Sequence, residues 1–162
     1  MTLGLSIAQF TLLHVAISLV AIASGGVVMV AFAAGRRILA GLSGLFLMTT
    51  VATTLTGFLF PFHGATPAFL TGVVSVPVLI GALVAFYGYR VRGRAGAVYA
   101  VSASAALYLN LLAFVTQAFL KVPALHALAP SGTELPFLAV QVAVLGGMIG
   151  LGRCALRAAT QG

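Results

Sequence analysis

Five apolar runs, each long enough to cross a lipid bilayer, occupy nearly the whole chain. They cover residues 6–34, 38–60, 67–89, 95–120 and 136–156. A spanning helix needs about 20 consecutive, mostly apolar residues, and each run meets that length. The sequence therefore predicts an all-α integral membrane protein, a bundle of five transmembrane helices that forms one domain over residues 1–162.

The scarcity of charge supports this fold class. Only 6% of the residues are charged and 62% are hydrophobic, whereas about 25% of a soluble domain is charged. So few charges cannot cover a surface that faces water, and we expect the outer surface to face lipid. The net charge of +7 does not indicate a nucleic-acid partner, because nearly all basic residues lie in short gaps between the apolar runs.

The arginines set the expected orientation. They are Arg36, Arg37, Arg90, Arg92, Arg94, Arg153 and Arg157. With five spans, all of them fall on one side of the membrane, and the positive-inside rule makes that side cytoplasmic. The N-terminus is then expected outside and the C-terminus in the cytoplasm, with Lys121 as the one basic residue on the outer face.

Two features predict local helix geometry. Gly146 and Gly150 form a G-x-x-x-G motif in the fifth run, and small residues let helices approach closely in lipid, either within the bundle or between copies in a homo-oligomer. Pro77 in the third run removes a backbone hydrogen bond, which predicts a kink or a local opening there.

With this orientation, the polar residues of the spans collect in the outer half of the bundle. The candidate ligand-binding residues are His14, Thr53, Asn110, Gln117, Lys121, His126, Glu134 and Gln141. Polar groups at membrane depth are costly unless they pair, face the bundle interior or line water. We therefore expect a polar cavity that opens outward, although the amides and His14 would serve equally as ties between helices.

The longest connection, residues 121–135, is expected to cap this cavity or merely to join two spans. It holds Lys121, His126 and Glu134, which include the only lysine and the only acidic residue of the chain. Glu134 also fits a capping box with Ser131, in the first turn of the fifth helix. Its alternative role is an ion pair with Lys121 or a histidine.

Several cofactors remain open at this stage. A metal site would use His14, His63, His126 and Glu134, since imidazole and carboxylate suit zinc or iron. A haem would need two facing axial ligands, and His14 is expected about 10 Å deeper than the other histidines. A quinone would take His14, Gln117 and Gln141 as polar anchors.

Two quoted segments carry a resemblance to known proteins. The run ALYLNLLAFVTQAFLKVPALHALAPSGTELPFLAVQ, residues 106–141, together with TGFLFPF, residues 56–62, resembles a group of small bacterial polytopic inner-membrane proteins. The resemblance implies a bacterial inner-membrane location and carries no catalytic residue.

The absence of aspartate and of nucleotide-binding loops favours a binding protein over an enzyme. We expect a membrane protein whose outward cavity binds a small ligand or ion, or which acts as an accessory subunit of a larger membrane complex. The alternative is a membrane redox protein that holds haem or quinone through the histidines and glutamines of the outer half.

Overall fold

The computed structural model describes residues 4–36, 39–60, 64 and 66–161. Within these residues there is no β-strand, and the elements run α1 (Ile7–Ala33), α2 (Ala40–Phe58), α3 (Pro67–Leu83), the π-helical turn η1 (Val84–Gly88), α4 (Arg94–Lys121), α5 (Pro123–Leu128) and α6 (Leu135–Gln161). The predicted all-α class is confirmed. His63 and Arg37, which the sequence analysis singled out, lie outside the described residues.

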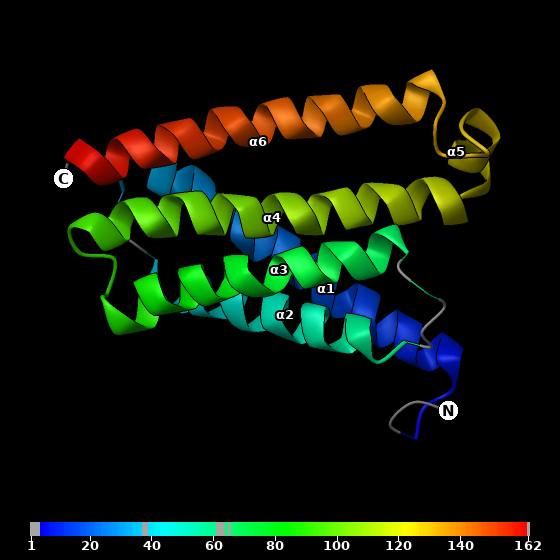
Figure 1. Cartoon of the computed structure of the whole chain (residues 1–162), viewed down its shortest axis with the longest axis horizontal. Coiled ribbons are helices and arrows are strands. Elements are labelled where there is room, and N and C mark those ends of the chain that lie inside the picture. Colours follow the sequence, from blue (N-terminus) through cyan, green and yellow to red (C-terminus); the bar gives the residue numbers. More distant parts are fainter. Residues whose placement is uncertain (1–3, 37–38, 61–63, 65, 162) are drawn as a thin grey trace.

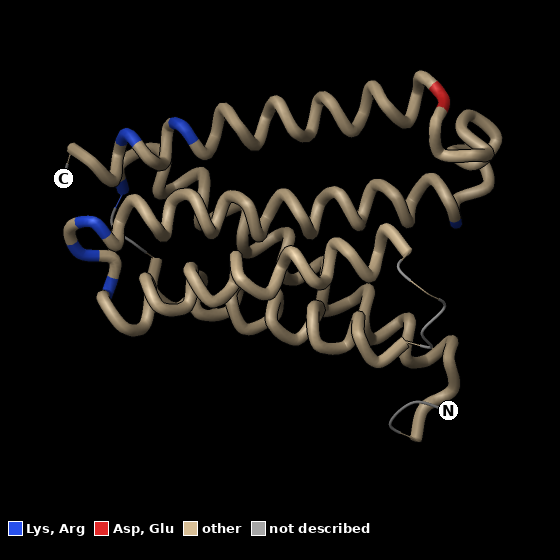
Figure 2. Tube along the Cα trace, in the orientation of Figure 1, with Lys and Arg blue, Asp and Glu red and all other residues tan. Residues whose placement is uncertain are grey.

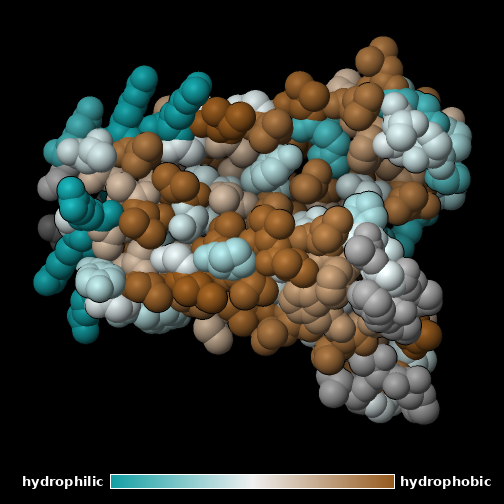
Figure 3. Space-filling view, in the orientation of Figure 1, coloured by the Kyte–Doolittle hydropathy of each residue, from teal (hydrophilic) through white to brown (hydrophobic). Residues whose placement is uncertain are grey.

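Five of the described helical segments are long and apolar enough to cross a membrane, with α3 and η1 together forming the third. These segments lie side by side along the long axis of the molecule, and the chain ends lie at opposite ends of the bundle (Figure 1). The five segments are those predicted, and this arrangement suits a multi-pass membrane protein. A broad apolar surface separates the two more polar ends (Figure 3), as a bilayer requires.

The described arginines gather at one end of the bundle, which we call the arginine end (Figure 2). They are Arg36, Arg90, Arg92, Arg94, Arg153 and Arg157. Glu134 and Lys121 lie at the other end, which we call the cavity end (Figure 2). The segregation of charge predicted from the sequence is therefore present in the fold.

The core is packed around Tyr99 and Phe46, both completely buried. Tyr99 meets Phe32 and Phe86 with ring centroids 5.6 and 5.8 Å apart. Helix α1 approaches α2 closely at Gly25, where a Cβ would lie only 2.6 Å from two ring carbons of Phe46. The absence of a side chain at Gly25 is therefore a packing requirement of the α1–α2 interface.

The glycine motif of α6 packs against nothing in the described chain. A Cβ added at Gly146, Gly147 or Gly150 would meet no atom within 4 Å. The expectation that this motif packs helices within the bundle is therefore wrong, because these glycines face outward. The close approach of α6 to α4 uses Gly152 instead, whose Cβ would meet Ser104 Oγ at 3.2 Å.

Helix α3 continues regularly through Pro77 as far as Leu83. The irregular geometry comes later, in the η1 turn, where the Tyr89 amide donates to the Val84 carbonyl at 3.1 Å. The departure from α-helical geometry therefore lies nearer the arginine end than the proline predicted.

Candidate functional site

A cavity of about 330 Å³ lies among α1, α2, α3 and α4 at the cavity end of the bundle. Its polar lining residues are Thr11, His14, Thr53, Thr54, Thr66, Thr71, Ser75, Asn110, Gln117 and Lys121. Aromatic rings of Phe58, Phe60 and Phe69 complete the wall. The cavity thus brings together five of the residues proposed from the sequence: His14, Thr53, Asn110, Gln117 and Lys121.

His14 on α1 and Thr56 on α2 form a polar contact between these two helices. The Nδ1 atom of His14 lies 2.8 Å from the Thr56 hydroxyl oxygen. That hydroxyl already donates its only hydrogen to the Ala52 carbonyl at 2.7 Å. A threonine hydroxyl has one hydrogen; when that hydrogen lies on the Ala52 carbonyl, His14 donates from Nδ1 and the neutral ring keeps its lone pair on Nε2. Nε2 has no partner among the described residues.

A second threonine of α2, Thr50, forms an analogous contact with Asn110 on α4. The Asn110 side-chain amide on α4 donates to Thr50 Oγ1 at 3.1 Å, and the Thr50 hydroxyl donates to the Phe46 carbonyl at 2.7 Å. Thr50 can therefore only accept from Asn110, which fixes the orientation of the Asn110 amide. The amide oxygen of Asn110 stays free of protein partners in the described chain and is available to the cavity.

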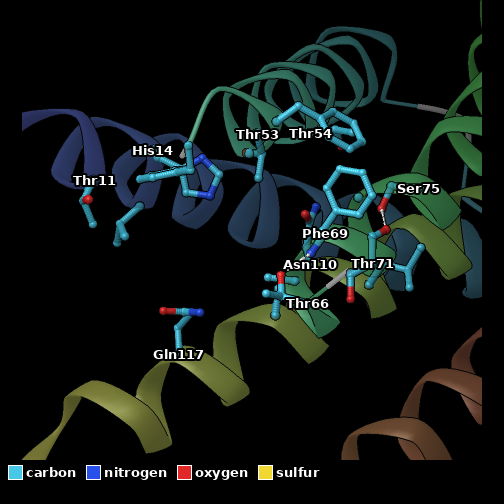
Figure 4. Close-up of a pocket in the computed structure, with 18 of the residues that line it drawn as sticks. Thr11, His14, Thr53, Thr54, Thr66, Phe69, Thr71, Ser75, Asn110 and Gln117 are labelled. Atoms are coloured by element: carbon cyan, nitrogen blue, oxygen red, sulfur yellow. Dashed lines mark hydrogen bonds between the residues drawn. The ribbon is translucent and has the colours of Figure 1, made fainter. Parts of the chain in front are cut away.

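Gln117 and Lys121 supply donors along the α4 wall. Gln117 reaches from α4 toward the space that His14 faces from α1 (Figure 4). Lys121 is the last residue of α4, where a cation is also favoured by the helix dipole. The wall therefore offers an ammonium and an amide group opposite an imidazole.

Helix α3 contributes residues that the sequence analysis did not include. Thr71 and Ser75 lie one turn apart on its cavity face (Figure 4), and the Ser75 hydroxyl donates to the Thr71 carbonyl at 2.8 Å. Thr66 caps the helix by accepting from the Phe69 amide at 3.2 Å. The i, i+4 spacing of Thr71 and Ser75 was the signal that the sequence offered. Serine and threonine in a helix bond back to the backbone so often that this spacing alone does not identify a site.

Gln141 on α6 lies outside the cavity. Its amide nitrogen contacts the Leu112 carbonyl at 3.4 Å and the Thr116 hydroxyl at 3.2 Å, both on α4. This is the helix-tying role that the sequence allowed as an alternative. Counting along the helix placed Gln141 at the same depth as the other amides. Its side chain, however, leaves α6 toward Leu112 and Thr116 on α4 and does not reach the cavity.

The connection after α4 packs over α4 and α6, and of its residues only Lys121 lines the cavity. Ala129 is buried together with Val115 and Phe119, and Leu125 and Phe137 pack against them. His126 is exposed in α5. The connection therefore covers the end of the α4–α6 pair, which fits the predicted alternative of a simple join between two spans better than that of a cap over the cavity.

Glu134 stabilises this connection and does not cap the first turn of α6. Its carboxylate accepts hydrogen bonds from the Ser131 amide at 3.0 Å, the Ser131 hydroxyl at 2.8 Å and the Thr133 amide at 3.0 Å. Glu134 precedes Leu135, and α6 has no acidic residue in its first turn. The bond from the Ser131 amide is the half of the predicted Ser131–Glu134 capping box that the structure shows, and it lies in the connection before α6. The bonds from the Ser131 amide and the neighbouring donors lower the pKa of Glu134 to about 2.

No group of three or more His, Cys, Asp or Glu side chains gathers as a metal site in the part of the chain that the structure describes. His14 is the only histidine among the cavity-lining residues found there, while His126 and Glu134 do not line it. His63 lies outside the described residues, so its place in the predicted metal set stays a prediction.

No family model, curated protein or solved structure matches this chain.

Proposed function

We propose that this chain is a multi-pass protein of the bacterial inner membrane that binds a small uncharged or anionic organic molecule in the cavity between α1 and α4. Its cavity end faces the outside, because the positive-inside rule assigns the arginine end to the cytoplasm. The bilayer is then its permanent partner.

The single observation that supports this proposal is the hydrogen-bond pattern around His14. With the Thr56 hydrogen on the Ala52 carbonyl of α2, His14 presents an acceptor on Nε2, and Lys121 and Gln117 present donors on the opposite wall. A ligand that fits has an O–H or N–H group for His14 and a carbonyl or carboxylate oxygen for Lys121.

The charge of the cavity selects against cations. The chain holds one acidic residue, Glu134, whose carboxylate is bonded to Ser131 and Thr133 in the connection. A metal ion or an organic cation would therefore meet Lys121 without a carboxylate to compensate it. The rings of Phe58, Phe60 and Phe69 favour a ligand with an apolar or planar part.

The free Nε2 atom also favours a second candidate, a redox role. A hydroquinone can donate its hydroxyl to an unprotonated imidazole, and a haem iron can take Nε2 as an axial ligand while Nδ1 stays hydrogen-bonded. An absorbance scan of the purified protein separates this candidate, because haem gives a Soret band and a quinone gives an ultraviolet band that changes on reduction.

Native mass spectrometry of the protein purified in mild detergent tests the proposal. A retained small molecule should be lost in His14→Ala and in Ala113→Leu, which fills the cavity, and kept in His126→Ala, which changes a histidine outside it. Equal retention in all three variants would contradict a site at His14.

A further inference from the structure

A second hollow lies between α4 and α6, toward the arginine end and separate from the polar cavity. It has a volume of about 280 Å³, and its lining runs from Tyr108 and Leu145 to Arg153 and Leu156. Because α4 and α6 run in opposite directions (Figure 1), the hollow is a groove along both helices. We call it the α4–α6 groove.

The floor of the α4–α6 groove behaves as an apolar surface, because its one hydroxyl, on Ser104, is bonded to the backbone. Ser104 and Met148 are 7% and 9% exposed, and the Ser104 hydroxyl donates its hydrogen to the Ala100 carbonyl at 2.7 Å. The rims are exposed side chains, including Val101 at 55% and Ile149 at 46%. Nothing in the floor offers a free donor, so the groove suits a hydrocarbon chain.

One end of the groove carries a positive charge. Arg153 lines it and Arg157 follows one turn later on α6. Figure 2 shows these two arginines on α6 at the arginine end, with Glu134, the only acidic residue of the chain, at the opposite end. No side-chain carboxylate of the described residues lies near Arg153, so an anion from elsewhere is a complementary partner.

The length of α6 places Arg153 at the depth of a lipid phosphate. Arg153 lies 18 positions after Leu135, which is about 27 Å of helix at 1.5 Å per residue. The hydrocarbon core of a bilayer is about 30 Å thick. A guanidinium at this height therefore meets the headgroups while the apolar groove extends back beneath them.

We propose that the α4–α6 groove binds an anionic phospholipid, with an acyl chain along the groove and the phosphate group on Arg153. The site is independent of the polar cavity and of the ligand proposed there. Anionic lipids are attracted to basic clusters on the cytoplasmic face, with a preference of about fivefold for each engaged cation.

Native mass spectrometry of the full chain in detergent, titrated with dioleoyl phosphatidylglycerol or dioleoyl phosphatidylcholine, measures the Kd of the first bound lipid. We expect phosphatidylglycerol to bind more tightly. Arg153→Gln should weaken phosphatidylglycerol about fivefold and phosphatidylcholine less, because the choline group compensates the charge of its phosphate. Arg92→Gln removes the same charge at the same end, away from the groove, and should change neither Kd. Equal losses in both variants would overturn the proposal.

Filling the groove tests the acyl-chain part. Ala105→Leu should weaken both lipids, and Ala143→Leu, an exposed alanine of α6 outside the groove, should weaken neither. If Ala105→Leu fails to give a folded chain, Ile149→Ser on the rim replaces it, with the exposed Val142→Ser as control. A groove variant that binds both lipids as tightly as its control overturns the proposal.

Two other occupants are outcomes of the same experiment. If inorganic phosphate displaces phosphatidylglycerol and its binding survives Ala105→Leu, Arg153 holds a free phosphate and the lipid proposal fails. If the native spectrum shows two copies that separate in Ala105→Leu while neither lipid prefers the wild-type chain, a second copy covers the groove and the proposal also fails.

Discussion

Replacing Gly25 by alanine should destabilise the bundle, whereas the same change at Gly26 should not. The added Cβ at Gly25 would lie 2.6 Å from Phe46 Cδ2 and Cε2 and 3.1 Å from Leu107 Cδ1, while at Gly26 it would meet nothing within 4 Å. Carbon atoms pack at about 3.5–4.0 Å, so the Phe46 ring has to move by about 1 Å. Phe46 is 0% exposed, so its ring cannot move out into solvent without opening the α1–α2 interface.

The magnitude follows from comparing the two variants. Both gain the helix propensity of alanine over glycine, about 1 kcal/mol in water, so this term cancels in their difference. What remains is overpacking at Gly25, which costs about 1–3 kcal/mol. We therefore expect the unfolding free energy of Gly25→Ala to lie about 1–3 kcal/mol below that of Gly26→Ala.

The tyrosines provide the assay. The chain has 4 tyrosines and no tryptophan, and Tyr99 is completely buried in the core. Its near-ultraviolet circular dichroism should disappear as the bundle opens during a titration with sodium dodecyl sulfate in mixed micelles. A double-mutant cycle with Phe46→Leu should show that the smaller side chain relieves part of the Gly25→Ala penalty. Equal stability of the two alanine variants would refute the packing of α1 on α2 described above.

Three further outcomes follow from the structure. The pKa of Glu134 is about 2, against an ordinary value of 4.5. The hydrogen bonds to its carboxylate therefore stabilise the fold fully above pH 4.5, and this stabilisation is lost as the pH falls through about 2. Nuclear magnetic resonance should show the Ser131 and Thr133 amides titrating near pH 2 in the wild type and not in Glu134→Gln. A cycle of Asn110→Leu and Thr50→Val should give a coupling of about 1 kcal/mol in the tyrosine assay, and zero coupling would exclude their hydrogen bond. A reporter fused to the C-terminus should be active only in the cytoplasm, and activity outside would reverse the assignment of the cavity end.

The helices could be predicted closely because their signal is local. Length and hydropathy define a span, and the second predicted run, residues 38–60, corresponds to α2 at Ala40–Phe58. The distribution of the arginines is equally local, since it needs only the number of spans between them. These features do not depend on how the helices are rotated against one another.

The site was only partly predictable because depth along a helix can be counted, whereas direction around its axis is set by packing. His14 and Gln141 were expected at similar depth, yet His14 lines the cavity and Gln141 contacts Leu112 and Thr116 on α4. Thr50, at i, i+3 with Thr53, was missed for the same reason. Only the folded bundle shows that it accepts from Asn110.

The polar cavity cannot stay empty within a bilayer. Each unsatisfied polar group in a hydrocarbon environment costs several kcal/mol, and the cavity leaves the His14 Nε2 and the Asn110 amide oxygen without protein partners in the described chain. Water satisfies them if the cavity is open to the aqueous side, where Lys121 stands at the end of α4. A ligand must then replace that water at both acceptors. A molecule with one donor for His14, a second donor for Asn110 and an acceptor for Lys121 does so, whereas an apolar molecule of the same size leaves both acceptors unpaired. The specificity of the proposed ligand site would therefore come from the two threonine hydroxyls that are bonded within α2, because they decide which atoms of His14 and Asn110 remain for a ligand.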